Sequence, residues 1–455
     1  MFYNREYEIK ALEEQYKKSG SAFTVIYGRR RVGKTALITE FIRDKPAIYY
    51  FATEGMMTEQ IASFAKSMFK LLEKPELDDV KFSSFEQALY FLADHLGKKK
   101  LILVFDEYQN LVKAQKSFSS VLQKAWDTRL AQSNIYLILC GSILSMMYSE
   151  TLSYSSPLYG RRTSSIHLKP MSPLTIQEFL PEISLENLMS CFAAFGTVPK
   201  YLEIYDAKKS FRTNIKEKIL SKDSYLYNEV RFLLKEEITQ PGQYFQLLST
   251  IASGHSKIGK IASTLHTQPS KLTRYLQILS DFDIVEKEVP ITETNPAKSR
   301  FGRYRIKDNF MAFWFYYVYR NLSQLEIRNI DPVLQQIDET FNQKFVSFAF
   351  EDYVKELLLH HPKKYLGFIP QKIGRWWNNK EEIDLIAFND EHVAFIECKW
   401  QNQQVGYEVY QGLKDKAKAL DFQQQHQYII FAKKGFKTSL KESECKLYSY
   451  LKPGK

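Results

Sequence analysis

The stretch that decides the fold is Gly28-Arg-Arg-Arg-Val-Gly33-Lys34-Thr35, which fits the phosphate-binding loop pattern G-x-x-x-x-G-K-[ST] without a mismatch. The apolar run 23–27 before it predicts a buried strand, and residues 36–42 after it predict a helix. A strand, a glycine-rich turn and a helix N-terminus in this order point backbone N–H groups at phosphate oxygens. The sequence therefore predicts an α/β domain that binds a nucleoside triphosphate.

Each residue type in the loop has a chemical role in that prediction. We expect Lys34 to reach the β- and γ-phosphate oxygens and the Thr35 hydroxyl to bind Mg²⁺. The predicted cofactors are accordingly ATP and Mg²⁺. The predicted nucleotide-binding residues are Gly28, Arg29, Arg30, Arg31, Val32, Gly33, Lys34, Thr35, Ala36 and Ser142.

A second apolar run supports the same domain. Residues 100–105 are continuously apolar after Lys100 and end in Asp106-Glu107, as expected of a parallel strand whose carboxyl end opens onto a ligand site. We expect Asp106 to hold Mg²⁺ through water and Glu107 to orient or deprotonate the attacking water. A third strand, 135–141, leads to Ser142, which is either a sensor of the γ-phosphate or an ordinary turn residue.

Together these strands resemble the AAA+-related ATPases of the archaeal-ATPase and STAND group. The segments Leu158-Tyr-Gly-Arg161-Arg162 and 195–202 are similar to that family's post-strand loop and lid. The resemblance implies that an arginine completes the nucleotide site, from the same chain or a neighbour, and Arg161 or Arg162 matches by position. A basic pair on a surface loop is the alternative interpretation.

Bulk composition sets wider limits. A chain of 455 residues is too long for one core and suggests about three domains. A net charge of +11 favours an anionic partner, nucleic acid before a membrane surface. The 4 cysteines are scattered without metal-like spacing, which fits a reducing cytoplasm. No signal peptide, membrane anchor or membrane partner is expected, whereas a homo-oligomer is possible.

Changes of pattern predict four parts: a P-loop ATPase core at 1–170, a helical lid at 171–240, a winged helix-turn-helix at 241–330 and a last domain at 331–455. Three short amphipathic helices begin near 244, 257 and 270, and two short strands follow. This order is that of a winged helix, which also follows the ATPase core in the family resembled. Ser270, Lys271 and Arg274 would meet DNA if the third helix enters a groove. A lid or protein-contact module is the alternative.

The last domain carries a second set of polar residues. Glu351 lies on an amphipathic helix, Asp384 begins a strand, and the next strand ends in Glu397-Cys-Lys399. Glu397 and Lys399 share one strand face, beside Asp384 across a hairpin. Carboxylates in this pattern can bind Mg²⁺, and Lys399 can position water or stabilise charge on phosphorus.

This pattern resembles the PD-(D/E)xK nuclease superfamily, in the form of a DUF234-type domain with a restriction-endonuclease-like fold. Asp384, Glu397 and Lys399 match its catalytic core, and Glu351 matches its helix-borne acid. The resemblance makes Glu351, Asp384 and Glu397 the expected metal ligands. The chain departs from it at Ile383, where many members have proline. An ordinary ion pair in an inactive nuclease fold is the alternative interpretation.

The whole sequence thus predicts a cytoplasmic ATPase that acts on DNA, with a Mg²⁺-dependent endonuclease-like domain gated by nucleotide state. The alternative is a STAND-like regulatory ATPase whose inactive nuclease fold binds a partner or DNA. A small-molecule kinase is a third hypothesis, but it accounts for neither the winged helix nor the last domain.

Overall fold

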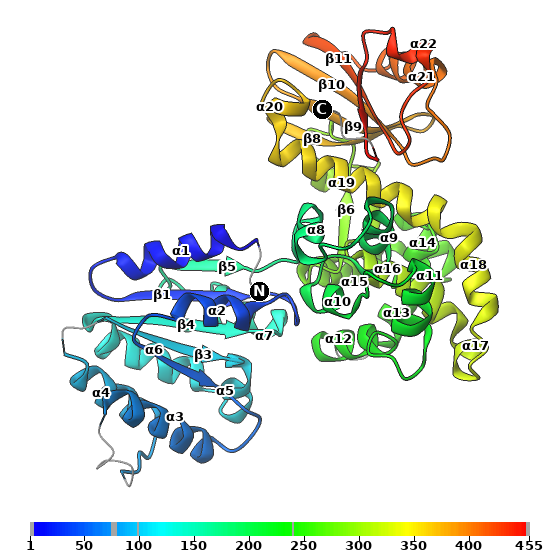
Figure 1. Ribbon diagram of the computed structural model, residues 1–455. Coiled ribbons are helices and arrows are strands. Elements are labelled where there is room, and N and C mark those ends of the chain that lie inside the picture. The colour runs from blue at the N-terminus through cyan, green and yellow to red at the C-terminus, as the bar shows by residue number, and fades with distance from the viewer. Residues whose placement is uncertain (1–3, 74–79, 98–99, 239–240, 452–455) are drawn as a thin grey trace. The chain divides into compact units, whose positions relative to one another are not determined.

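The computed structural model describes residues 4–73, 80–97, 100–238 and 241–451. It consists of two compact units, Met1–Met171 and Ser172–Lys455, each with its own sheet (Figure 1). Residues 239 and 240, at the predicted end of the lid, lie outside the described residues. No helix in the described part of the chain is long and apolar enough to cross a membrane.

The first unit is built on a parallel sheet of five strands in the order β2-β3-β4-β1-β5. The strands are β1 (Ala22–Tyr27), β2 (Ala47–Phe51), β3 (Leu101–Asp106), β4 (Ile135–Gly141) and β5 (Ser164–His167). Every residue of β3 and β4 is buried, which explains their continuous apolar sequences. The carboxyl ends of β1, β3 and β4 meet at one edge, so this edge carries the phosphate loop and the polar residues after β3 and β4.

Helices cover both faces of this sheet (Figure 1). One core layer lies under α1 (Glu6–Lys17) and α2 (Lys34–Ile42). The other lies under α3 (Met57–Leu72), α4 (Phe85–His95), α5 (Tyr108–Ala114) and α6 (Phe118–Thr128). A short helix, α7 (Leu144–Met147), follows β4. The predicted α/β class, with a P-loop parallel sheet, is confirmed.

The second unit begins with a helical region whose core is continuous with one face of the later sheet. Its helices are α8 (Ile176–Phe179), α9 (Leu185–Phe195), α10 (Pro199–Ile204), α11 (Phe211–Ile215), α12 (Glu229–Glu237), α13 (Gly242–Ala252), α14 (Ile258–Thr264), α15 (Pro269–Asp281), α16 (Asn309–Phe313), α17 (Leu322–Glu326) and α18 (Asp331–Phe341). The aromatic run at 310–319 lies in this core, where Trp314 is fully buried and donates a hydrogen bond from Nε1 to the Tyr227 carbonyl oxygen at 2.7 Å.

The segment predicted as a winged helix contains α13, α14 and α15, followed by an antiparallel hairpin of β6 (Val285–Glu288) and β7 (Arg303–Ile306). Leu272, Leu276 and Leu279 form the buried face of α15, at the helical spacing expected from sequence. Its opposite face, with Ser270, Lys271 and Arg274, is exposed.

The chain ends in a mixed sheet of five strands in the order β12-β11-β10-β9-β8. The strands are β8 (Lys372–Trp377), β9 (Glu382–Phe388), β10 (His392–Lys399), β11 (Gln425–Ala432) and β12 (Lys446–Ser449). One face packs against α19 (Ser347–His360), next to α20 (Pro362–Tyr365), and the other against α21 (Tyr407–Ala417) and α22 (Thr438–Lys441). Because β9 and β10 are antiparallel neighbours, the strand that carries Asp384 lies beside the strand that carries Glu397.

Candidate functional site

The phosphate loop has the backbone that its glycines permit. Gly28 and Gly33 have positive φ angles of 156° and 95°, which side-chain-bearing residues rarely adopt. A Cβ atom on Gly28 would also lie 2.2 Å from the Leu168 carbonyl oxygen, so the loop approaches the segment after β5 too closely for any larger residue. The loop then enters α2 directly at Lys34.

Lys34 lies inside the curve of this loop. Its side chain is buried, and Nζ donates hydrogen bonds to the carbonyl oxygens of Gly28 at 2.8 Å and Arg29 at 3.0 Å. Burial lowers the pKa of Lys34. A buried ammonium held only by neutral carbonyls suits an anionic ligand, so these residues fit a bound triphosphate.

Asp106 links the loop to the edge of the sheet. Its Oδ2 accepts hydrogen bonds from Thr35 Oγ1 at 2.9 Å and from the Tyr49 hydroxyl at 2.5 Å, and its Oδ1 accepts one from the backbone N–H of Glu107 at 2.9 Å. A hydroxyl beside a carboxylate is the oxygen-donor set that Mg²⁺ requires, so the residues predicted to hold that ion fit it. Tyr49 was not predicted, although its strand β2 pairs with β3. Burial and Asp106 raise the pKa of Tyr49.

Glu107, Gln109 and Ser142 form a closed polar group at the ends of β3 and β4. Ser142 Oγ donates to Glu107 Oε2 at 2.9 Å, Gln109 Nε2 lies 3.1 Å from Ser142 Oγ, and Gln109 Nε2 also donates to Glu107 Oε2. Gln109 and Ser142 are 1% and 2% exposed, so the packed interior of the unit holds their side chains in place. Sequence analysis missed Gln109, whose only signal is its position two residues after Glu107.

Arg161 and Arg162 make local contacts in this structure. Arg161 Nε and Nη2 donate to Asp127 at 2.8 Å each, and Arg162 Nη1 donates to the Thr151 carbonyl oxygen at 2.9 Å. Both therefore serve as anchors of their loop here, and a catalytic role for either stays a prediction.

Asp384, Glu397 and Lys399 come together at one end of the second sheet. Lys399 Nζ lies 2.5 Å from Glu397 Oε1, and Lys416 Nζ of α21 lies 3.3 Å from the same oxygen. Asp384 Oδ2 accepts a hydrogen bond from the backbone N–H of Cys398 at 2.7 Å. Burial and the nearby Glu397 raise the pKa of Asp384 to about 6. The predicted catalytic set is thus adjacent, but its acid Glu397 is neutralised by two lysines.

Glu351, the predicted helix-borne acid, is held by a different partner. Arg375 Nε donates to Glu351 Oε2 at 2.9 Å, while burial and Asp384 raise the pKa of Glu351. Within the described ranges, no three His, Cys, Asp or Glu side chains form a group that could hold a metal ion. In this structure Glu397 is held in ion pairs with Lys399 and Lys416, and Glu351 in an ion pair with Arg375, so two of the three predicted metal ligands are already paired with cations.

The hairpin after α15 is fastened to the last sheet. The backbone N–H of Ile291 donates to the Arg375 carbonyl oxygen at 2.9 Å, and Trp377 Nε1 donates to the Phe301 carbonyl oxygen at 3.0 Å. Arg303 pairs with Glu382 at 2.8 Å and lies 4.4 Å from the centre of the Trp377 ring. These contacts hold the hairpin and its connecting loop against the last sheet.

Helices α14 and α15 carry cations without counter-charges. Lys257, Lys260, Lys271 and Arg274 are exposed, and across the described residues none of the four makes an ion pair with a carboxylate. Unpaired cations on one helical pair attract phosphates, whereas paired ones contribute little.

Comparison with known proteins agrees with the first-unit geometry. Residues 2–204 match a family described as an ATPase domain predominantly from Archaea, and residues 314–411 match a family, DUF234, described as archaeal and bacterial proteins of unknown function. A Walker-type ATPase of Pyrococcus abyssi superimposes with a TM-score of 0.52 at 21% identity, covering 69% of this chain and 96% of that one. At that identity the likeness concerns the fold.

The relatives in sequence range from a short local match to one that covers nearly the whole chain. An uncharacterized ATP-binding protein of Methanocaldococcus jannaschii is 44% identical over 45 residues, which are 10% of this chain and 76% of that protein. An uncharacterized protein of the same organism is 37% identical over 454 residues, 98% of this chain and 99% of its own length. The chain therefore belongs to the archaeal ATPase family, in the form that joins a P-loop ATPase domain to a C-terminal DUF234 domain.

Proposed function

We propose that this chain is a Mg²⁺-dependent, cytoplasmic ATP hydrolase whose nucleotide state controls how its second unit engages DNA. The observation that carries the proposal is the polar array at the ends of β3 and β4. In this array Asp106 accepts a hydrogen bond from Thr35 of the phosphate loop, and Glu107 accepts one from Ser142. The array supports the proposal because Thr35 and Asp106 form a hydroxyl–carboxylate pair suited to Mg²⁺, and Glu107 next to them is a carboxylate able to orient water, as hydrolysis of a phosphoanhydride requires.

The residues divide the work by their chemistry. The loop N–H groups and Lys34 bind the phosphates, and Thr35 with Asp106 would hold Mg²⁺, which neutralises charge on the phosphate oxygens. Glu107 accepts a proton from, or orients, the attacking water. The Ser142 hydroxyl donates a hydrogen bond to Glu107. A phosphate oxygen that accepted this hydrogen bond instead would free the Glu107 carboxylate to bind the attacking water.

The test is the substitution Glu107→Gln, which keeps the side-chain shape and removes the negative charge. We expect ATP binding to stay within about two-fold of wild type and phosphate release to fall by a factor of about 100 or more. Glu54→Gln, on an exposed side chain of the same unit, is the matched control. Hydrolysis at the wild-type rate by Glu107→Gln would remove Glu107 from the mechanism and with it the carrying observation.

DNA engagement is proposed through α14 and α15. Support comes from the unpaired Lys257, Lys260, Lys271 and Arg274 and from the net charge of +11. Because phosphate contacts release counterions, this binding should weaken steeply as salt concentration rises.

A second candidate function is metal-dependent DNA cleavage at Asp384, Glu397 and Lys399. Their adjacency favours it, whereas the ion pairs of Glu397 with Lys399 and Lys416 favour an inactive nuclease fold that binds DNA or a partner. Supercoiled, linear and single-stranded DNA should be incubated with Mg²⁺ or Mn²⁺, with and without ATP. Cleavage by wild type that disappears in Lys399→Ala would establish the nuclease. No cleavage by protein that hydrolyses ATP would support the binding role.

A further inference from the structure

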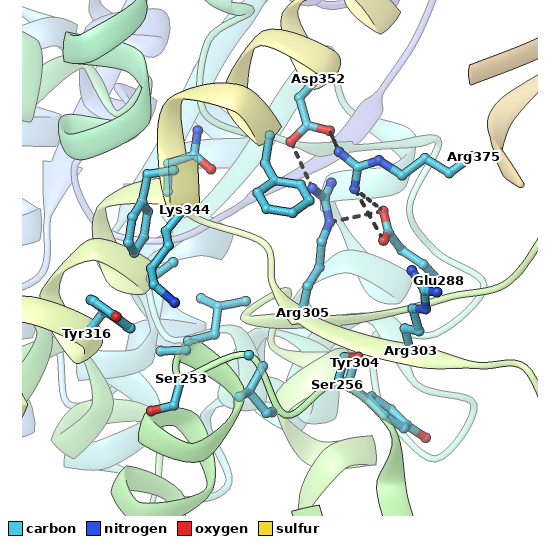
Figure 2. Close-up of a pocket in the computed structure, with 18 of the residues that line it drawn as sticks. Ser253, Ser256, Glu288, Arg303, Tyr304, Arg305, Tyr316, Lys344, Asp352 and Arg375 are labelled. Carbon is cyan, nitrogen blue, oxygen red and sulfur yellow. Dashed lines mark hydrogen bonds and ion pairs between the residues drawn. The ribbon is translucent and has the colours of Figure 1, made fainter. Parts of the chain in front are cut away.

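A pocket of about 550 Å³ opens within the second unit, between the hairpin β6-β7 and the helical segment that runs from 342 into α19 (Figure 2). Its walls come from the end of α13, from β7, from this helical segment, and from β8. This size lies in the range of small-molecule sites, and concave sites of this kind combine apolar walls with a few polar groups. Neither the phosphate loop nor the Asp384 site contributes a residue to the pocket.

One side of the pocket is a rigid ionic frame. Arg305 Nη1 pairs with Asp352 at 2.8 Å, and Arg375 pairs with Asp352 at 3.2 Å and with Glu288 at 3.3 Å (Figure 2). Coulombic attraction to the surrounding carboxylates raises the pKa of both arginines, although burial opposes it.

The other side carries a cation that the protein leaves unneutralised. Lys344 lines the pocket, and in Figure 2 its side chain extends toward Tyr316 and Ser253. Lys344 Nζ lies 5.4 Å from the centre of the Tyr316 ring, and no carboxylate of the described chain pairs with it. The three arginines that line the pocket are all paired with carboxylates, so Lys344 is the lining cation that offers its charge to an anionic ligand.

Aromatic rings form the remaining wall. Phe348 lines the pocket and is 49% exposed, and the Arg375 guanidinium carbon lies 5.8 Å from the centre of its ring. Phe345, Tyr304 and Trp377 also line it. An exposed ring in a pocket that also contains an ammonium group can stack on a planar base while the cation binds its phosphate.

We propose that this pocket binds a single nucleotide unit, a planar base that carries a phosphate. Phe348 stacks on the base, and Lys344 binds the phosphate. The unit is either a free nucleotide or an unpaired nucleotide of a single strand, since both present the same chemistry. The inference goes beyond ATP hydrolysis and beyond the proposed contact of α14 and α15 with DNA.

The experiment uses the full chain with Lys34→Ala, which removes nucleotide binding at the phosphate loop. Binding of dTMP is measured by calorimetry, and binding of a fluorescent oligo(dT) strand by anisotropy. We expect Phe348→Ala and Lys344→Glu each to weaken binding by about ten-fold or more. Phe348→Trp, which retains a stacking surface, should bind as wild type does.

Matched controls come from α12, outside the pocket. Phe232→Ala removes an exposed ring and Lys235→Glu reverses an exposed charge, and both should leave binding unchanged. Binding of dTMP identifies a free nucleotide as the source, and binding of oligo(dT) alone identifies a strand. The proposal is overturned if neither ligand binds, or if the pocket variants bind as well as the α12 controls. Thermal melting of each variant separates a lost site from a lost fold.

Discussion

Arg375 is the residue whose removal tests the described structure of the second unit most directly. It lies on β8, it is 10% exposed, and its guanidinium reaches Glu351, Asp352 and Glu288 at 2.9, 3.2 and 3.3 Å. Substitution Arg375→Met keeps an unbranched, largely apolar side chain and removes all of these bonds. We expect this variant to unfold at a clearly lower temperature than the wild type, because a buried carboxylate then loses its partner.

The magnitude follows from what each carboxylate retains. Asp352 and Glu288 keep Arg305, at 2.8 and 3.1 Å, whereas Glu351 is 12% exposed and pairs with no second cation among the described residues. Breaking a buried pair costs about 3–5 kcal/mol. Because only Glu351 is left without a cation, we expect the free energy of unfolding to fall by about 3 kcal/mol. For a unit of this size that corresponds to a decrease of about 6 °C in melting temperature.

The assay is thermal unfolding followed by circular dichroism, with three comparison variants. Arg328→Met removes an exposed pair with Asp223 and should change the melting temperature by no more than about 1 °C. The double variant Arg375→Met/Glu351→Met replaces both partners with apolar groups and should recover most of the loss. Arg375→Lys should fall in between, because lysine cannot make the forked contacts. If Arg375→Met melted at the same temperature as the wild type, the reasoning would be refuted, since the network would then contribute nothing to stability.

Four further predictions concern the nucleotide and DNA sites. Lys34→Ala should abolish ATP binding in a filter assay while the exposed-site control Lys113→Ala binds normally, and equal binding by both would contradict the assigned loop. Gln109→Leu removes a donor to Glu107, so kcat should fall about ten-fold with little change in ATP affinity; a change confined to affinity would argue against a positioning role. Chelation of Mg²⁺ with EDTA should stop hydrolysis and added Mg²⁺ should restore it, whereas full activity in EDTA would exclude the Thr35–Asp106 pair as a metal site. Lys271→Ala with Arg274→Ala should weaken duplex binding at all sequences and reduce the slope of log K against log salt by about 2, and an unchanged slope would place DNA elsewhere.

The sequence determined most of the first unit because its signals are local. The phosphate loop spans eight consecutive residues, and the strands at 22–27, 101–106 and 135–141 are almost entirely apolar, with Thr24 and Asp106 as the exceptions. A parallel strand buried on both faces has no other composition available to it. Asp106 and Thr35 were predicted to act on one ion, and they lie 2.9 Å apart.

The sequence could not predict the contacts in that unit between side chains from different strands and helices. Tyr49 reaches Asp106 from β2, and Gln109 reaches Ser142 from α5. Each is a common residue without a motif of its own. Its role exists only because the sheet places distant segments side by side.

In the second unit the tertiary structure decided more. The sequence placed Glu351, Asp384, Glu397 and Lys399 on the correct helix and strands, since helical and strand periodicity are also local. Lys399, which pairs with Glu397 from the same strand, was in the predicted set, whereas the other counter-ions come from elsewhere: Lys416 from α21 and Arg375 from β8. The charge state of a buried acid depends on every group that packs around it. The sequence by itself therefore determined which residues form the site, and only the folded chain decided which of them are already paired.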